Sequence, residues 1–312
     1  MPDAGLIDRF VPAGKRIVIT GAGGWLGLVT LDRLKTALGS AFDSTVWAFG
    51  STTRDLVLRD GSVVRQRPLS ELSRLPSAPT WLFHFAFLTK DRAETMEEDA
   101  YRAANGEIRN VVLNALDVIG AEAVFVASSG AAYKASDPTA SAAMRLYGAL
   151  KLLDEEAFAV WGAQPAKRVV LARVFNVTGP YINKHQAYAL ASFILDGLAG
   201  RSIAVRAPRP VIRAYVAIEE LLALALAELG TQCGVSRFDT GGDPLELADV
   251  AKVVASQCGN GDVNRATITQ PGADVYHGDV EAYRDLLCRH GIAPVSLPQQ
   301  IAKTIDYLRA AQ

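Results

Sequence analysis

A tyrosine and a lysine stand four residues apart in the stretch YGALK, as Tyr147 and Lys151. On a helix, side chains at positions i and i+4 project from one face, so the phenol and the ammonium would be neighbours. A nearby ammonium favours the phenolate and lowers the pKa of a tyrosine from its ordinary value of ~10. The pair therefore indicates general acid–base catalysis, although the same spacing also occurs on ordinary amphipathic surface helices.

Two serines end an apolar run that we interpret as a strand. They are Ser128 and Ser129, and the second lies eighteen residues before Tyr147. In an open parallel sheet, ligands bind at the carboxyl ends of the strands. A serine hydroxyl in this place is therefore able to polarise a substrate oxygen.

The stretch IVITGAGGWLG runs from β-branched residues into four glycines within seven positions. A strand ending at Thr20, a glycine turn and a helix opening at Trp25 would present bare backbone N–H groups to an anion. The first glycine permits the tight turn, the middle one lets a pyrophosphate approach, and the last lets the helix pack on the strand. We predict a dinucleotide site, because the turn follows the first strand of an α/β pattern, although a glycine turn without a ligand also fits. The predicted contacts are Gly21, Gly23, Gly24, Trp25, Leu26 and Gly27.

The end of the second predicted strand bears on which dinucleotide would bind. An acidic residue there would bond the adenosine ribose hydroxyls and repel a 2′-phosphate. Here the strand runs into GSTTR, so Ser51 and Arg54 stand where an acid is expected. A guanidinium makes bidentate contacts with phosphate. We therefore predict a preference for NADP(H) through Ser51 and Arg54, with NAD(H) as the alternative, while an ordinary solvated loop would also explain these residues.

Short apolar runs alternate with segments in which apolar residues recur every three or four positions. This rhythm predicts a parallel sheet covered by helices on both faces. The expected fold class is α/β, a Rossmann-type doubly wound parallel sheet with a smaller C-terminal substrate-binding lobe. The predicted strands are Arg16–Thr20, Thr45–Phe49, Trp81–Ala86, Ala123–Ser128 and Arg168–Val174, and the predicted helices between them are Trp25–Leu38, Glu98–Leu116 and Tyr147–Trp161.

The rhythm changes near Gly179, where glycine and proline become frequent. We predict a dinucleotide-binding domain of residues 1–178 plus about 210–242, and a substrate lobe of residues 179–209 and 243–312. In the lobe, Asp243 and Pro244 resemble an N-cap followed by a first-turn proline. Two further helices are predicted over 280–290 and 298–308.

The composition excludes several classes of protein. Half of the 312 residues are hydrophobic, 21% are charged and the formal net charge is −1, which argues against a general nucleic-acid-binding surface. Three widely spaced cysteines and four histidines show neither a disulfide framework nor a zinc spacing. Since we find no secretory signal and no apolar run of ~18 residues, we expect a soluble, cytoplasmic protein without a membrane or metal partner.

Taken together, the glycine turn, the strand-terminal serine and the YxxxK pair resemble the short-chain dehydrogenase/reductase superfamily in order and approximate spacing. The extended, sugar-nucleotide branch, with its NAD(P)-dependent epimerases, dehydratases and reductases, is the most similar. TGAGGWLG resembles its TGxxGxxG, FHFAFLTK its HxA stretch, SSGAAY its SSxxxY, RVFNVTGP its RxxNVxGP and VIRAYVAIEE its RDxxxVxD segment. The likeness covers most of the chain and implies a Rossmann fold.

The resemblance implies a role for each residue of a Ser129–Tyr147–Lys151 triad. Tyr147 would move the proton, Lys151 would hold the nicotinamide ribose and bias Tyr147, and Ser129 would orient the reacting oxygen. We choose Ser129 over Ser128 because it lies four residues before Tyr133, as in SSxxxY. By the same resemblance the cofactor would also contact Tyr147, Ala86 and Val174. The substrate would contact Ser129, Asn176 and Arg213, the last through a diphosphate.

Two positions depart from the branch in a way that bears on the reaction. The 4,6-dehydratases carry Asp-Glu after the catalytic Ser/Thr, where this chain has Gly130 and Ala131, so dehydration is not expected. We expect reduction of a 4-keto-deoxysugar nucleotide with Tyr147 as general acid. The alternatives are an NAD-dependent nucleotide-sugar 4-epimerase and, in a different class, a non-catalytic dinucleotide-binding sensor. The resemblance also implies a homodimer through the helices 98–116 and 147–161, while His84, in the HxA stretch, is expected to be structural.

Overall fold

The computed structural model describes residues 6–231, 233–259 and 261–310, and the chain forms two compact units. Within the described residues, the first unit consists of 6–174 and Leu222–Asp239, and the second of Phe175–Leu221 and 240–310. The segment 210–221, which we predicted in the dinucleotide-binding domain, therefore lies in the second unit. The physical reason is strand pairing, because both strands of this segment pair with strands of the second unit.

The first unit is built on a sheet of eight strands in the order β12-β7-β6-β5-β1-β2-β4-β3. All neighbours are parallel except β3 and β4. The chain order reverses between β1 and β5, which lie side by side, so their carboxyl ends form the switch point where ligands of doubly wound sheets bind. The strands are β1 Arg16–Thr20, β2 Val46–Gly50, β3 Arg54–Val57, β4 Val63–Pro68, β5 Thr80–His84, β6 Ala121–Ser129, β7 Arg168–Val174 and β12 Gly234–Asp239.

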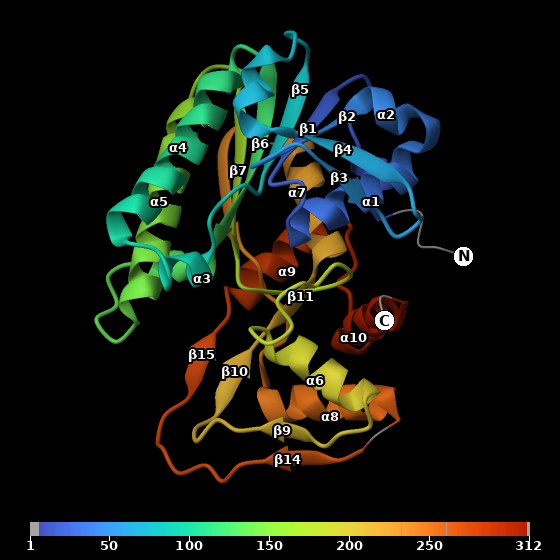
Figure 1. Ribbon diagram of the computed structural model, residues 1–312, viewed down its shortest axis with the longest axis vertical. Helices are drawn as coiled ribbons and strands as arrows, with labels where there is room; N and C mark the ends of the chain where they lie inside the picture. Colours follow the sequence, from blue (N-terminus) through green and yellow to red (C-terminus); the bar gives the residue numbers. More distant parts are fainter. Residues whose placement is uncertain (1–5, 232, 260, 311–312) are drawn as a thin grey trace. The chain divides into compact units, whose positions relative to one another are not determined.

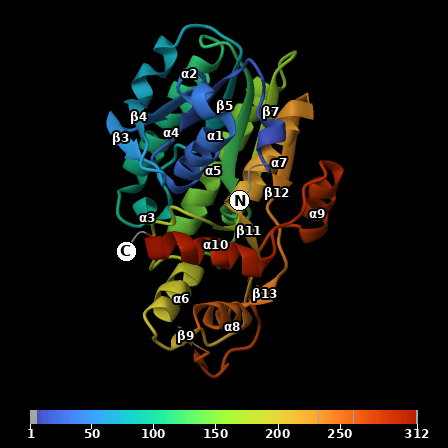
Figure 2. The same cartoon turned by 90° about the vertical axis from the view of Figure 1, so that its right-hand side faces the viewer.

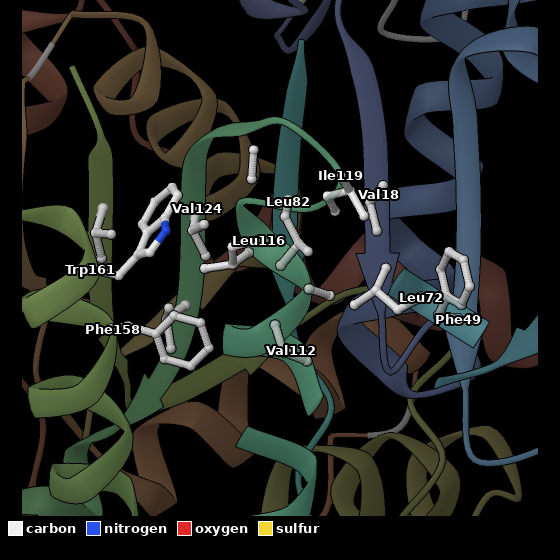
Figure 3. Packing of buried hydrophobic residues seen from close by; sticks show 14 of the residues in the cluster. Val18, Phe49, Leu72, Leu82, Val112, Leu116, Ile119, Val124, Phe158 and Trp161 are labelled. Carbon is white, nitrogen blue, oxygen red and sulfur yellow. The ribbon is translucent and has the colours of Figure 1, made fainter. Parts of the chain in front are cut away.

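Helices cover both faces of this sheet. Figures 1 and 2 show α4 (Glu98–Leu116) and α5 (Ala142–Gly162) on one face and α1 (Trp25–Leu38) on the other. The strands are continuous apolar runs because both faces of the sheet are covered, and every residue of β5 is buried. In Figure 3, Leu116 of α4 and Phe158 of α5 pack against strand residues such as Val124 in a shared core. The shorter helices of this unit are α2 Phe42–Thr45 and α3 Lys90–Ala93, and α7 Ile218–Thr231 belongs to it from Leu222 onward.

Helix α5 starts earlier than we predicted. Its N-cap is Ser141, whose side chain accepts a hydrogen bond from the N–H of Met144, so the helix begins at Ala142 instead of Tyr147. A capping serine stabilises a helix start by satisfying a backbone N–H group that has no partner within the helix. The consequence is that Tyr147 and Lys151 lie inside a regular helix, where the i and i+4 positions share a face.

The described residues of the second unit form small sheets of short strands together with helices. Strand β8 (Asn176–Thr178) pairs with β11 (Tyr215–Ala217), β9 (Ile203–Val205) pairs with β14 (Val263–Arg265), and β10 (Val211–Arg213) lies between β13 (Leu245–Glu246) and β15 (Asp274–Tyr276). Figure 2 shows α6 and α8 side by side in this unit. The helices are α6 Ala189–Leu198, α8 Leu247–Cys258, α9 Val280–Arg289 and α10 Leu297–Ala310.

The predicted helix start at Asp243 and Pro244 is wrong. Helix α8 begins at Leu247, and its cap is Glu246, whose carboxylate accepts from the N–H of Ala248. The preceding residues Leu245 and Glu246 are paired with β10 and are therefore extended, which prevents a helix from starting before them.

Candidate active site

The glycine turn lies at the switch point and is packed against backbone on two sides. Gly21 has a φ of 71°, in the left-handed region that favours glycine, and a Cβ atom there would lie 2.6 Å from the N atom of Ala86. A Cβ on Gly27 would lie 2.4 Å from the carbonyl oxygen of Gly21. The turn is thus held between the ends of β1 and β5 and the first turn of α1, and it places the predicted contact Ala86 beside Gly21.

Three amides of the turn donate to acceptors within the protein. The N–H of Ala22 donates to the carbonyl of Phe49 at 3.0 Å, that of Gly23 to the Oε1 atom of Gln66 at 3.1 Å, and that of Gly24 to the carbonyl of Gly21 at 2.9 Å. Helix α1 follows with Gly24 as its N-cap, and the first amides of a helix have no partner within it. The amides that remain for an anion are therefore those at the start of α1, from Trp25 onward, and the approach of a pyrophosphate to Gly23 stays a prediction.

The space left by the missing side chain of Gly23 is filled by Arg54. A Cβ atom on Gly23 would lie 1.7 Å from the Nη2 atom of Arg54, so the guanidinium lies directly on the turn. Arg54 is the first residue of β3 and is exposed, as is Ser51 in the preceding loop. The structure thus brings Arg54 onto the turn, and the glycine at position 23 admits a side chain of the protein.

The two serines at the end of β6 have different partners. The hydroxyl of Ser128 donates to Glu155, a buried carboxylate that Arg173 holds through two hydrogen bonds of 2.9 and 2.8 Å. The Oγ atom of Ser129 accepts from the N–H of Ala131 at 3.2 Å, and a hydroxyl that accepts still carries a proton to donate. The predicted contact Val174 is the register partner of Ser129 on β7. Ser129 is therefore the serine whose hydroxyl suits the orientation of a ligand oxygen.

A phenylalanine links the tyrosine and the lysine of α5. The ring of Phe87 meets the ring of Tyr147 edge to face, with centroids 5.6 Å apart, and the Nζ atom of Lys151 lies 3.8 Å from the centroid of Phe87. The same Nζ atom donates to the carbonyl of Ala127 at 2.8 Å. Phe87 was not among our predicted site residues, because nothing in a sequence shows which ring a helix packs on. These contacts fix the positions of the Tyr147 ring and the Lys151 ammonium.

Burial lowers the pKa of Lys151. Its side chain is only 6% exposed, and the loss of solvation lowers its pKa to about 8, although the charges of Asp154 and Glu155 act in the opposite direction. His84 is also buried, which lowers its pKa to about 3 with help from the charge of Lys151. The Nδ1 atom of His84 lies 2.8 Å from the hydroxyl of Thr20, so a neutral ring that joins β5 to β1 fits the structural role that we expected.

Gly148 brings helix α5 against the loop that follows Ser129. A Cβ atom on Gly148 would lie 2.1 Å from the carbonyl oxygen of Ala131, in the 3-10 helix η4 (Gly130–Lys134). Only a glycine permits this approach, and it sits between Tyr147 and Lys151 in the sequence. The contact therefore sets the position of Tyr147 and Lys151 relative to Ser129, a role of Gly148 that we did not predict.

The two residues predicted to contact the substrate from the second unit are held by their own neighbours. The Nδ2 atom of Asn176 donates to the carbonyl oxygens of Ala214 and Tyr276 at 3.1 and 3.2 Å. Arg213 forms an ion pair with Asp274, with 2.8 Å between Nη2 and Oδ2. A diphosphate at Arg213 would therefore share the guanidinium with a carboxylate, so this residue remains a prediction.

Two further findings concern the described part of the chain, residues 6–231, 233–259 and 261–310. Among the residues that the structure describes, no three or more side chains of His, Cys, Asp or Glu come together as ligands for a metal ion. None of the helices in the described ranges has the length and apolar character needed to cross a membrane.

Comparison with protein families gives a match over most of the chain. The model described as "NAD dependent epimerase/dehydratase family" matches residues 17–232. This range includes the glycine turn, Ser129, Tyr147, Lys151 and Arg213. A comparison with curated proteins finds no match.

Comparison with solved structures shows the same fold in several enzymes. A UDP-N-acetylglucosamine 4-epimerase from Methanobrevibacter ruminantium, in complex with UDP-N-acetylmuramic acid, is 17% identical with a TM-score of 0.74, covering 96% of this chain and 99% of that one. A UDP-glucose 4-epimerase from Thermotoga maritima, with UDP-glucose, is 17% identical with a TM-score of 0.70, covering 95% and 99%. TunA, an NAD-dependent NDP-hexosamine 5,6-dehydratase of tunicamycin biosynthesis, is 18% identical with a TM-score of 0.70, covering 95% and 98%.

Proposed function

The chain belongs to the NAD-dependent epimerase/dehydratase family, and from this premise we propose that it is an NAD(P)-dependent enzyme that acts on a nucleotide-activated sugar. The residues fit a dinucleotide, because the tight turn of Gly21 and the start of α1 form an anion site at the switch point of the sheet. A bound nicotinamide dinucleotide supplies the group that gives or takes a hydride. The protein supplies Tyr147, Lys151 and Ser129 around the reacting oxygen.

Proton transfer at the sugar oxygen is assigned to Tyr147. Its phenol lies on the same face of α5 as the ammonium of Lys151, and a positive charge stabilises the phenolate that remains when the proton is given away. Ser129 donates a hydrogen bond that orients the oxygen. Lys151 also holds the nicotinamide ribose through donors that its bond to Ala127 leaves for this purpose, since an ammonium has three.

The direction that we propose is reductive, with NADP(H), at a keto group of a deoxysugar nucleotide. The observation that carries this proposal is the guanidinium of Arg54 lying on Gly23. In addition, the last residue of β2, Gly50, and the following Ser51 are not acidic. An arginine in this place favours a 2′-phosphate, whereas an acid would repel it.

Replacing Arg54 with alanine tests the cofactor preference. A hydrogen bond to a charged group contributes roughly 1.5–3 kcal/mol, so Arg54→Ala should weaken NADPH binding about 10- to 100-fold while the Kd for NADH changes less than about threefold. Calorimetric titration of the apoprotein measures both constants. Arg65→Ala is the matched control, since Arg65 is an exposed arginine on β4 that pairs with Asp55. Wild-type protein that binds NADH more tightly than NADPH would contradict the preference.

The second candidate is an NAD-dependent 4-epimerase, which the names of the first two solved structures above favour. In that reaction Tyr147 takes a proton from the hydroxyl at C4 and returns it after the intermediate sugar has rotated. Denaturing the purified protein and identifying the released dinucleotide separates the two candidates. Stoichiometric NAD, with interconversion of two sugars and no net cofactor consumption, would support the epimerase and contradict the reductase.

Dehydration across C5 and C6 in the manner of 4,6-dehydratases is not proposed. That elimination needs an acid and a base beside the triad, and the two buried positions after Ser129 are Gly130 and Ala131. The likeness in fold to a 5,6-dehydratase does not alter this, because Gly130 and Ala131 carry neither an acid nor a base.

The lowered pKa of Lys151 predicts that cofactor binding depends on pH. The ammonium is protonated below pH 8 and loses its proton above it, so the Kd for NADPH should rise between pH 8 and 9.5 by up to about tenfold per pH unit. Binding to Lys151→Met should be weaker and independent of pH over this range. The effect on stability has the opposite sign: the unfolded chain holds this proton up to its ordinary pKa of 10.5, so raising the pH from 8 to 10.5 stabilises the fold. A wild-type Kd that stays flat would contradict the assignment of Lys151.

We also propose a homodimer through α4 and α5. Two apolar side chains on one face of α5 are exposed, Leu153 at 44% and Val160 at 73%. They lie seven residues apart, so they share a stripe of the helix. A Val160→Asp variant should sediment as one copy at micromolar concentration where the wild type sediments as two, because an unpaired carboxylate in an apolar interface is costly. A wild-type monomer would contradict this proposal.

A further inference from the structure

Gln66 connects the glycine turn to the loop that precedes Arg54. It lies on β4 and is only 1% exposed. Its Oε1 atom accepts from the N–H of Gly23 at 3.1 Å, and its Nε2 atom donates to the carbonyl of Thr52 at 2.7 Å. A Cβ atom on Gly50 would lie 2.4 Å from this amide, so the end of β2 also gives it room.

The two bonds require a side chain that accepts at one end and donates at the other. An amide satisfies both, and glutamine has the length to span them. A carboxylate would accept from Gly23 but face the oxygen of Thr52 without a proton, and a thioether would leave both backbone groups unsatisfied. Glutamine therefore has both the length and the hydrogen-bonding groups that are needed to connect the turn to the loop.

The same residue also determines where Arg54 lies. In the antiparallel pairing of β3 and β4, Arg54 is the register partner of Gln66. Thr52, which the Gln66 side chain holds, stands two residues before Arg54. Both the strand and the loop that carry the guanidinium are thus fixed to the turn through one side chain.

Arg54 is the charged group that lies against Gly23 and would recognise an anion beside this glycine. Asp55 projects to the opposite face of β3 from Arg54 and pairs with Arg65, with 2.7 Å between Nη1 and Oδ1. Since Gln66 also occupies the amide of Gly23, recognition of a phosphate beside Gly23 depends on the guanidinium.

We propose that Gln66 is a positioning residue that sets the preference for a 2′-phosphorylated dinucleotide by holding Arg54 on the glycine turn. This inference rests on the proposed use of NADP(H). Gln66 acts without touching the cofactor, through its bonds to Gly23 and Thr52. The proposed cofactor site thus includes a side chain of β4 in addition to the glycine turn and the end of β2.

A double-mutant cycle on the apoprotein tests this role. The probes are 2′,5′-ADP and 5′-AMP, which differ in the 2′-phosphate and carry no nicotinamide, and calorimetry gives both Kd values. Gln66→Met should lower the ratio of affinities for 2′,5′-ADP over 5′-AMP at least about tenfold, and Arg54→Ala should lower it similarly. In the Arg54→Ala background, Gln66→Met should change the ratio less than about twofold, because the two residues act as one unit. Gln66→Glu keeps the size of the side chain and the acceptor for the N–H of Gly23, and it should also lower this ratio of affinities. It replaces Gln66→Met in the cycle if the methionine variant does not fold.

Different outcomes overturn the inference and the proposed function. A wild type that prefers 2′,5′-ADP, with a ratio unchanged by Gln66→Met or Gln66→Glu, overturns only the role of Gln66. The role of Gln66 is also overturned if Gln66→Met lowers the ratio of affinities equally in the wild type and in the Arg54→Ala background. Gln66 would then act on the fold and not through Arg54. A wild type that binds 5′-AMP as tightly as 2′,5′-ADP overturns the proposed use of NADP(H) itself.

Discussion

The Tyr147→Phe variant should lose about 10²–10⁴-fold in kcat, because it lacks the group to which we assign proton transfer to the sugar oxygen. The ring itself remains, so its edge-to-face contact with Phe87 is kept and the acid–base hydroxyl alone is removed. The Kd for the cofactor should therefore change less than about threefold. Steady-state turnover of a nucleotide sugar and calorimetric titration of the dinucleotide measure the two effects separately.

Tyr133→Phe is the control for loss of a phenol near the same sheet edge. Tyr133 is 56% exposed and donates to Asp239 at 3.0 Å, and we assign it no part in proton transfer. Its removal should change kcat less than about fivefold. If turnover survives Tyr147→Phe undiminished, the acid–base assignment is wrong and a non-catalytic dinucleotide-binding protein becomes the better account.

The elements around the cofactor site could be predicted closely from the sequence. The observed bounds of β1, α1, α4 and β7 are those that we predicted. Each of these segments has a clear apolar period and a local signal at its end, such as the glycines after Thr20. The Rossmann-type sheet is confirmed, and the resemblance to the extended branch is confirmed by the family match over residues 17–232.

Elements whose ends depend on distant partners could not be predicted in this way. Asp243 and Pro244 carry a local helix signal, but pairing with β10 keeps Leu245 and Glu246 extended and delays α8. The segment 210–221 is likewise assigned by its strand partners, which come from both sides of it in the chain. Local sequence does not encode which distant strand a short apolar run will meet.

The same limit applies to the site. Nothing in the sequence distinguishes Gln66 from the polar residues beside it, yet its side chain is buried and its two hydrogen bonds join three segments of the chain. The approach of a pyrophosphate to Gly23 stays a prediction, whereas the structure shows that the guanidinium of Arg54 lies against this glycine. A glycine motif shows that something approaches the backbone, and only the structure shows what does so.

The Gly148→Ala variant should lose about 10²-fold in kcat although it alters no reacting group. The added methyl would lie 2.1 Å from the oxygen of Ala131 and 2.9 Å from its carbonyl carbon, so α5 must move away from η4 by about 1 Å. Helix α5 carries Tyr147 and Lys151, whereas Ser129 stays with β6. A displacement of this size between reacting groups costs about 10²-fold, and the overpacked contact should also cost about 1–3 kcal/mol of stability.

Turnover of Gly148→Ala is measured well below its unfolding midpoint, so that the loss of activity is separated from the loss of fold. Gly106→Ala is the matched control, because Gly106 lies within α4 and its added methyl would meet only the Nη2 atom of Arg109 at 3.7 Å. That variant should keep wild-type kcat and gain up to about 1 kcal/mol, since alanine is the better helix former. The Kd for the cofactor should stay within about threefold of wild type in Gly106→Ala, whereas in Gly148→Ala it should rise less than kcat falls, because Lys151 moves with α5 while the glycine turn stays in place. Wild-type turnover in Gly148→Ala would show that α5 and η4 separate without moving Tyr147 relative to Ser129, and the positioning role of this glycine would be lost.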